Sequence, residues 1–229
     1  VTGVALTMMA TLDVLQRAAA ANLNLVITHE PTFFDHLDPT DNLIRENDPV
    51  TKAKLQFIAD HNMVVWRFHD YSHSMRPDLI MTGVIRALGW AKFQTETEGL
   101  MKMPPTTLSA LVGDIQKGLA PHAMRVVGDP SLRVTTVALV PGAAGFPMHR
   151  QALQRDDVQV LVIGEGREWE TVEYVDDAVA AGQRKALIII GHIPSEQPGM
   201  EDAARWLKMF VTEVPVAFVP AKDPFWKAK

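Results

Sequence analysis

The sequence predicts an α/β fold made of two related lobes of βαβ units with mixed sheets. Two observations predict it. Apolar runs of strand length alternate with amphipathic helical stretches over nearly all of the 229 residues, which is typical of βαβ units. The segment 1–6 also resembles the segment 134–139, and each is followed by a helix and a further apolar strand. We therefore expect a single two-lobed domain over residues 1–229, with lobes at about 1–100 and 122–229 and a connector at about 101–121.

The elements of the first lobe follow from apolar periodicity and from signals for helix ends. Asp48 before Pro49 marks a helix start, because Asp caps free amides and Pro fits the first helical turn. Gly89 closes a later helix. In chain order we expect strand 4–8, helix 11–21, strand 23–28, a helix from residue 49, strand 63–68 and helix 77–88.

The second lobe repeats the alternation of strands and helices. Residues 103–105 are expected to be a connector, because they contain two prolines. After it we expect helix 108–119, strand 134–140, helix 148–154, strand 158–163, helix 169–181, strand 186–190, helix 202–211 and strand 214–219.

Composition and charge exclude several classes of protein. The formal net charge of −5, without clustered Lys and Arg, argues against general nucleic-acid binding. No apolar run approaches the roughly 18 to 20 residues that cross a bilayer, so we expect no membrane span and a cytoplasmic location. The chain starts at Val1, which leaves a removed leader open. Because there is no Cys, any metal must be held by nitrogen and oxygen.

Histidines and carboxylates follow the predicted strands where each strand ends. His29 comes directly after strand 23–28, His69 after strand 63–68, and His192 two residues after strand 186–190. Glu165 follows strand 158–163 in the same way. Ligands of open α/β sheets bind beyond the carboxyl ends of the strands, so these side chains are candidates for one site.

The spacing of these residues predicts three pairs of metal ligands. Pro31 favours extended backbone at Glu30, so His29 and Glu30 should point to opposite sides and serve different ions. His69 and His73 are four residues apart, and so are His192 and Glu196, so a helical turn brings each pair to one side. We predict two divalent ions, held in the cleft between the lobes.

The type of ligand indicates the metal and the reaction. Imidazole and carboxylate suit zinc, manganese, iron, cobalt or nickel, and histidine disfavours calcium and magnesium. Two such ions about 3.5 to 4 Å apart can activate a bridging water, which makes hydrolysis the natural reaction. Glu165 is the candidate general base, whereas Glu168 and Glu170 are better explained as a solvated first helical turn. The four histidines without a strand-end position are expected at the surface or in caps: His36, His61, His122 and His149.

Each pair also has an ordinary interpretation, because a single His after a strand is commonly a hydrogen-bonded loop residue. The alternatives to a hydrolase are a metal-binding scaffold or regulatory oligomer without catalysis, and an α/β domain that binds no metal. Metal analysis of the purified protein separates the last of these from the others.

The same residues resemble the dinuclear metal-centre hexameric family, which is Nif3-like and often labelled as type 2 homologues of GTP cyclohydrolase I. The resemblance covers almost the whole chain and includes 27–31, 68–73, Gly164 with Glu165, and 191–196. In that family a strand-end His-His-Pro, a His followed four later by Asp, and a Gly-His followed four later by Glu surround two metals. Here Glu30 stands in place of the second His and His73 in place of the Asp, and both types still ligate metal.

The resemblance implies further properties that the residues alone do not give. It implies a ring-shaped homohexamer whose sites face an internal cavity. It also makes a nucleotide one candidate for the small polar substrate, and it carries His29, His69, His192 and Glu196 over as ligands of the family's own types.

Overall fold

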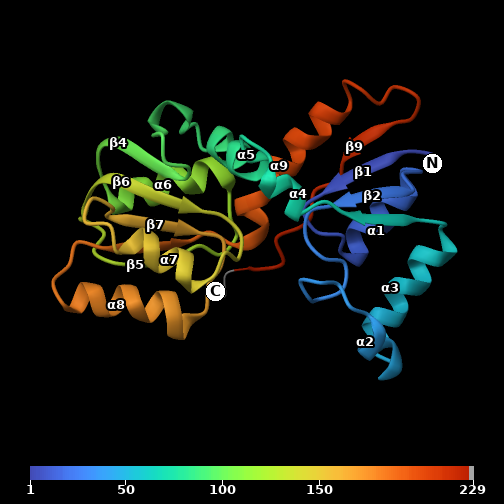
Figure 1. Cartoon of the computed structure of the whole chain (residues 1–229), viewed down its shortest axis with the longest axis horizontal. Coiled ribbons are helices and arrows are strands. Elements are labelled where there is room, and N and C mark those ends of the chain that lie inside the picture. The colour runs from blue at the N-terminus through green and yellow to red at the C-terminus, as the bar shows by residue number, and fades with distance from the viewer. Residues whose placement is uncertain (227–229) are drawn as a thin grey trace. The chain divides into compact units, whose positions relative to one another are not determined.

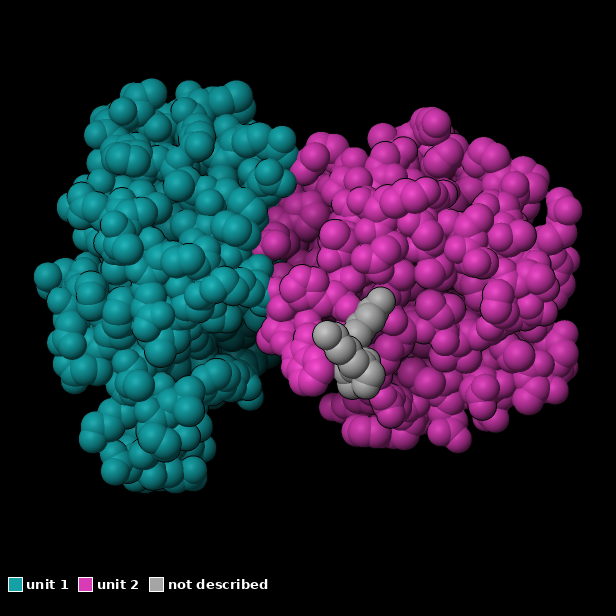
Figure 2. Space-filling view, turned by 180° about the vertical axis from the view of Figure 1, so that it is seen from behind, with its two compact units in different colours: residues 1–80, 199–222 teal, residues 81–198, 223–229 magenta. Residues whose placement is uncertain are grey.

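Two sheets, one in each of two compact units, organise the chain in the computed structural model, which describes residues 1–226 (Figures 1 and 2). Unit 1 contains Val1–Ile80 and Gly199–Lys222. Unit 2 contains Met81–Pro198 and the chain from Asp223 onward. The chain passes from one unit to the other within α5 (Leu79–Ala87) and returns within α9 (His192–Leu207). The predicted α/β class is confirmed.

The sheet of unit 1 is parallel, with the strand order β3-β2-β1-β9. Its strands are β1 (Val4–Thr7), β2 (Leu25–Thr28), β3 (Val64–Arg67) and β9 (Val216–Phe218). The helices lying wholly in unit 1 are α1 (Leu12–Ala20), α2 (Asp41–Arg45), α3 (Pro49–Asp60) and α4 (Asp70–Ser74). Residues of α1 and α9 complete the core, with Val14, Leu15, Ala18, Met200, Ala203 and Ala204 buried.

The sheet of unit 2 is mixed, with the order β4-β6-β7-β8-β5 and antiparallel strands at both edges. Its strands are β4 (Leu100–Thr107), β5 (Arg125–Val127), β6 (Arg133–Val140), β7 (Val160–Ile163) and β8 (Ala186–Ile189). Its helices are α6 (Leu108–Leu119), α7 (Phe146–Leu153), α8 (Glu173–Ala180), the 3-10 turn η1 (Ala91–Phe93) and the π-helical turn η2 (Glu168–Val172). One core cluster includes α5 and α6 residues and another α7 and α8 residues, so the sheet is covered on both faces (Figure 1).

The two sheets repeat one arrangement of three parallel strands. Their Cα partners join Val4 to Leu25 and Leu25 to Val64 in unit 1, and Val137 to Val160 and Val160 to Ala186 in unit 2. The likeness between 1–6 and 134–139 aligns Val4 with Val137, so the repeat in sequence agrees with the repeat in register. The strands β2 and β7, which precede His29 and Gly164, therefore occupy equivalent places in their sheets.

Local signals explain the helix ends. Asp48 caps α3 by accepting a hydrogen bond from the Thr51 amide at 2.7 Å, and Pro49 occupies the first turn, as predicted. Gly89 adopts a positive φ of 68° just after α5, as a helix-closing glycine does.

Three expectations about elements were wrong. Residues 103–105 lie inside β4, at an edge of the sheet where proline removes no inward hydrogen bond, and the register shifts between Lys102 and Thr106. The helix expected at 202–211 begins already at His192 and contains Pro198. The strand β9, which we placed in the second lobe, pairs with β1 in unit 1. The units are therefore discontinuous in sequence.

Within residues 1–226, none of the helices has the length and apolar character that a membrane crossing needs.

Candidate metal centre

Three imidazoles gather at the carboxyl ends of β2 and β3 in unit 1. His29 follows β2, His69 follows β3, and His73 lies in the short helix α4. One ring nitrogen of each lies within 4.8 Å of those of the other two. The ring centroids are 4.6 Å apart for His29 and His69, 5.0 Å for His29 and His73, and 4.7 Å for His69 and His73. The strand-end rule thus brings these residues together as predicted.

The Nδ1 atom of each of these rings contacts an oxygen acceptor. His29 Nδ1 lies 3.3 Å from the Phe68 carbonyl oxygen, His69 Nδ1 2.7 Å from Asp70 Oδ1, and His73 Nδ1 2.8 Å from Asp78 Oδ2. Histidines that bind metals donate their second N–H to such acceptors, which fixes the tautomer and the ring orientation. If Nδ1 carries the proton in each ring, the lone pair lies on Nε2, which is then the atom that would bind a metal.

Glu30 adds a carboxylate to this group. Its Oε1 lies 3.5 Å from His69 Nε2, and the side chains of both residues are mostly buried. The hydrogen bond with Glu30, assisted by Asp70, raises the pKa of His69 even though burial of the ring opposes this. A divalent cation would take the place of the proton that this environment favours, because both are attracted by the same carboxylates.

A second group forms at the carboxyl end of β8 in unit 2. His192 Nε2 lies 3.0 Å from Glu196 Oε2, and His192 Nδ1 lies 3.4 Å from Glu165 Oε1. Glu196 is only 3% exposed, whereas the Glu165 side chain is 56% exposed. The four-residue spacing places His192 and Glu196 on one side of the first turn of α9, as predicted. Glu165 and Glu196 thus lie against the two different ring nitrogens of His192.

Backbone packing holds this first turn of α9 in place. The buried Ser195 hydroxyl accepts a hydrogen bond from the Gly142 amide at 3.0 Å and donates one to the His192 carbonyl at 2.7 Å. Gly142 has a φ of +70°, and a Cβ there would collide with Glu196 Oε1. A Cβ at Gly164 would lie 2.5 Å from Ser195 Oγ. Glycines at the ends of β6 and β7 thus make room for the histidine and carboxylate of α9.

The two groups have a donor set that fits divalent transition metals. Unit 1 offers three imidazoles and the carboxylate of Glu30, and unit 2 offers the imidazole of His192 and the carboxylate of Glu196. Nitrogen-rich sites of this kind suit zinc, manganese, iron, cobalt and nickel.

Sequence reasoning missed the acceptors and misjudged one histidine, His149. Asp70 comes one residue after His69, which it contacts, and Asp78 comes five residues after His73. Such spacings of Asp and His are visible in the sequence, but they also occur often by chance. His36, expected at the surface, is exposed but shares a candidate ligand cluster with His69 and Asp70. His149, for which we expected the same, is fully buried, and its Nδ1 lies 2.8 Å from Thr171 Oγ1.

Comparison with known proteins matches nearly the whole chain to one family. Residues 1–224 match the Duf34/NIF3 (NGG1p interacting factor 3) family. No curated protein matches.

Several solved structures resemble the chain at low sequence identity. The protein ybgI, described as being of unknown function, is 19% identical with a TM-score of 0.76 over 98% of this chain and 86% of that one. A Bacillus cereus protein related to NIF3 is 13% identical with a TM-score of 0.73 over 100% and 90%. Reduced HcgD from Methanocaldococcus jannaschii is 13% identical with a TM-score of 0.65 over 96% and 83%. At these identities the likeness shows a shared fold.

Proposed function

This chain belongs to the Duf34/NIF3 family, and on that premise we propose that it binds two divalent metal ions and uses them to hydrolyse a small polar substrate. The proposed ligands are His29, Glu30, His69, His73, His192 and Glu196. The observation that carries the proposal is the cluster of three imidazoles in unit 1, each with its Nδ1 against an oxygen acceptor. Histidines that only pack in a core do not need an oxygen acceptor at each Nδ1 or ring nitrogens that face one another.

The residues of the chain have distinct roles in this proposal. Asp70, Asp78 and the Phe68 carbonyl each contact an Nδ1 atom and so orient the three imidazoles. Glu30 and Glu196 supply negative charge that balances the cations. Ser195 and Gly142 position Glu196. Bound metal would supply Lewis acidity and lower the pKa of a coordinated water.

Glu165 is the proposed general base. Its side chain is more exposed than those of Glu30 and Glu196 and lies at a strand end, so it is accessible to a substrate. Its 3.4 Å contact with His192 Nδ1 supports a second role, in which it orients the ligand. A Glu165→Gln variant separates the roles, because loss of the base lowers kcat at saturating metal, whereas loss of orientation lowers metal affinity.

Turnover of metal-loaded protein tests the hydrolase. A panel of phosphoesters, nucleotides and amides should contain at least one substrate whose hydrolysis requires added metal and is lost in His192→Ala. The matched control is His122→Ala, which removes an exposed imidazole of the same unit. A folded, metal-loaded protein with no metal-dependent turnover across the panel would contradict the hydrolase.

The same family and ligand groups also support a scaffold or regulatory oligomer without catalysis, in which the ions brace the fold. Chelation would then lower thermal stability or dissociate the assembly, with no activity to lose. The homohexamer implied by the family resemblance belongs to both versions, and analytical ultracentrifugation of the metal-loaded and chelated protein tests it.

A further inference from the structure

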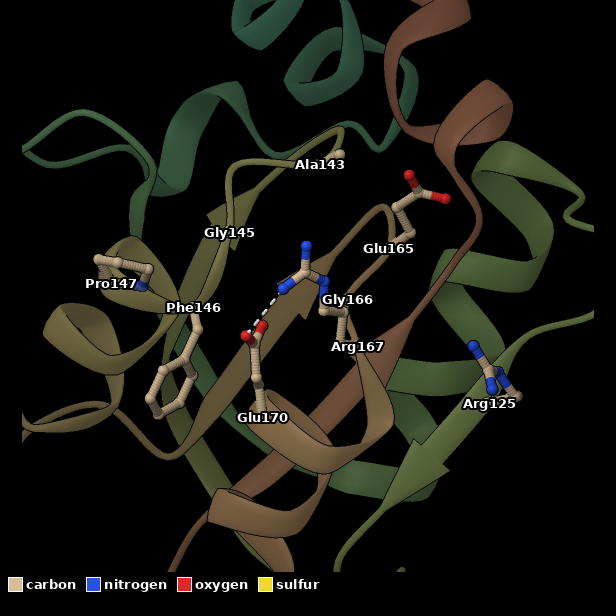
Figure 3. A pocket seen from close by; sticks show the side chains of 9 residues that line it. All are labelled: Arg125, Ala143, Gly145, Phe146, Pro147, Glu165, Gly166, Arg167 and Glu170. Atoms are coloured by element: carbon tan, nitrogen blue, oxygen red, sulfur yellow. Dashed lines mark hydrogen bonds and ion pairs between the residues drawn. The ribbon is translucent and has the colours of Figure 1, made fainter. Parts of the chain in front are cut away.

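A cavity of about 620 Å³ opens in unit 2 beyond the carboxyl ends of β6 and β7. It lies where ligands of α/β sheets bind, and its volume is that of a small-molecule pocket. It is lined by the loops that follow the two strands, the start of α7, Arg125 and the first turn of η2 (Figure 3). Nothing in the proposed metal chemistry uses it, apart from one shared residue, Glu165.

The walls of the cavity differ in character. Phe146 and Pro147 form an apolar side, and Arg125 lies across from them with Arg167 between in the view of Figure 3. Gly145 and Gly166 also line the cavity, so backbone rather than side chains borders it there. Gly145 has a φ of +86°, which favours glycine at this position. Such a cavity suits a molecule with an apolar body and a charged group.

Two guanidinium groups and two carboxylates, those of Glu165 and Glu170, line the cavity, and the guanidinium groups are the ones that can bind an anion. Arg125 pairs with Glu168 at 2.6 Å, and Arg167 with Glu170 at 3.2 Å. Both arginine side chains are more than half exposed, and ion pairs at such sites contribute little to the stability of the chain. Each arginine can therefore leave its glutamate and pair with a bound ligand at little cost in free energy. Guanidinium binds phosphate through two parallel hydrogen bonds, and a phosphate monoester carries close to two charges, which matches two arginines.

Glu165 connects this cavity to the candidate metal centre. Its carboxylate borders the cavity and contacts His192 Nδ1 at 3.4 Å. A molecule bound between Phe146 and the arginines therefore lies beside Glu165, which in turn contacts the proposed metal ligand His192.

We propose that this cavity binds a phosphate monoester with an aromatic or apolar body, held by Arg125 and Arg167 and packed against Phe146. The further step, that this ester is the substrate of the metal centre, rests on the proposed function. The binding of the ester to the cavity is independent of that function, because every residue that holds the ester lies outside the set of proposed metal ligands.

Titration of the metal-free chain with phenyl phosphate tests the proposal by calorimetry, with phenol, inorganic phosphate and benzylamine as comparison probes. Phenyl phosphate should bind most tightly, since only it meets both walls. Arg167→Gln and Arg125→Gln should each weaken its binding about tenfold, as expected for loss of a charge-assisted hydrogen bond. Arg155→Gln is the matched control, because Arg155 is an exposed arginine of the same unit that pairs with Asp157 away from the cavity lining.

Three results would overturn the proposal: no saturable binding of phenyl phosphate, equal binding by both arginine variants and the parent chain, or preference for benzylamine. Circular dichroism of each variant verifies that it is folded, and either arginine variant is sufficient if the other fails to fold. Metal content is measured on separate samples, so failure of the metal site and failure of this pocket are distinguishable.

Discussion

At the residue scale, the acceptor beside each Nδ1 determines what a strand-end histidine can do. A lone histidine in a loop is compatible with many roles, and its position in the sequence does not choose among them. In unit 1 the acceptors are a backbone carbonyl for His29 and carboxylates for His69 and His73. Because Asp70 and Asp78 hold Nδ1, the opposite nitrogen of each ring is the one available to a cation.

Asp78→Asn tests this orientation. Losing the carboxylate beside His73 Nδ1 should lower the affinity of the chain for zinc about tenfold or more, since outer partners of metal-bound histidines contribute this much. Competition with a chromogenic chelator measures it. Asp114→Asn, on the exposed side of α6, should leave zinc affinity unchanged. Equal affinity of a folded Asp78→Asn variant and the parent would show that Asp78 does not orient a ligand.

Lys54 is a second informative residue, because it is 6% exposed and holds the loop that follows Glu30. Its Nζ donates to the Thr32 carbonyl at 2.5 Å and lies 5.4 Å from the centroid of the Phe33 ring. Burial lowers its pKa from 10.5 to about 8, with the nearby Asp38 partly opposing the shift. The charged form is therefore less favourable in the folded chain than in the unfolded one.

This shift predicts a pH dependence of stability. Between about pH 8 and 10.5 the unfolded chain binds more protons at Lys54 than the folded chain, so this residue makes the free energy of unfolding rise with pH over that window. Below pH 8 its contribution is constant. Urea unfolding of the parent and of Lys54→Met should show the rise only in the parent, with the exposed Lys52→Met behaving as the parent does. Parallel curves for parent and Lys54→Met would contradict the assignment.

At the scale of elements, glycines decide how closely the loops after β6 and β7 approach α9. Gly142 has a positive φ and no room for a Cβ beside Glu196, whereas a Cβ at Gly113, inside α6, meets nothing within 4 Å. The two positions therefore make a matched pair. The same substitution should have opposite effects on stability at the two sites.

Gly142→Ala should destabilise the chain by about 1 to 3 kcal/mol and weaken metal binding, because both the backbone and Glu196 must move. Gly113→Ala should stabilise it by roughly 0.5 to 1 kcal/mol, the usual gain for replacing glycine inside a helix. Thermal unfolding with metal titration compares them. The packing described for Ser195 and Gly142 is wrong if Gly142→Ala is as stable as the parent and retains its metal affinity.

The sequence was sufficient for those elements whose signals are local. Apolar runs predicted β1, β2, β3, β6, β7 and β8, and the likeness between 1–6 and 134–139, from which we expected related lobes, falls on β1 and β6, whose pairings share one register. The position of β9 beside β1 depends on pairing across some 210 residues, which no local pattern reports. Two further expectations differ from the structure, since β4 runs through the prolines of 103–105 at a sheet edge and α9 begins at His192 and continues through Pro198.

The candidate site was predictable to the same degree. Strand ends identified His29, His69 and His192, and the spacing of four identified His73 and Glu196, because those rules depend only on chain geometry. The acceptors of Nδ1 and the burial of His149 come from tertiary packing, so they required the structure.

At the scale of the whole molecule, each unit contributes its own group of nitrogen and oxygen donors to the proposed function. Metal that binds only the folded chain stabilises it, by about 3 kcal/mol at a hundredfold excess over Kd. For a chain of this size, removing the metal with a chelator should therefore lower Tm by about 5 to 10 °C. The effect should be smaller in a variant lacking His29, His69 and His73 and unchanged in His61→Ala, which removes an exposed imidazole. Calorimetry with and without chelator measures it, and an unchanged Tm for metal-loaded parent would refute the stabilising role.

The central claim is that these histidines and carboxylates hold metal, and elemental analysis of the freshly purified chain tests it most directly. We predict about two equivalents of a divalent transition metal per chain, and fewer in His29→Ala and His192→Ala than in His61→Ala. A folded chain that contains no bound metal and takes up none from zinc or manganese would contradict the claim.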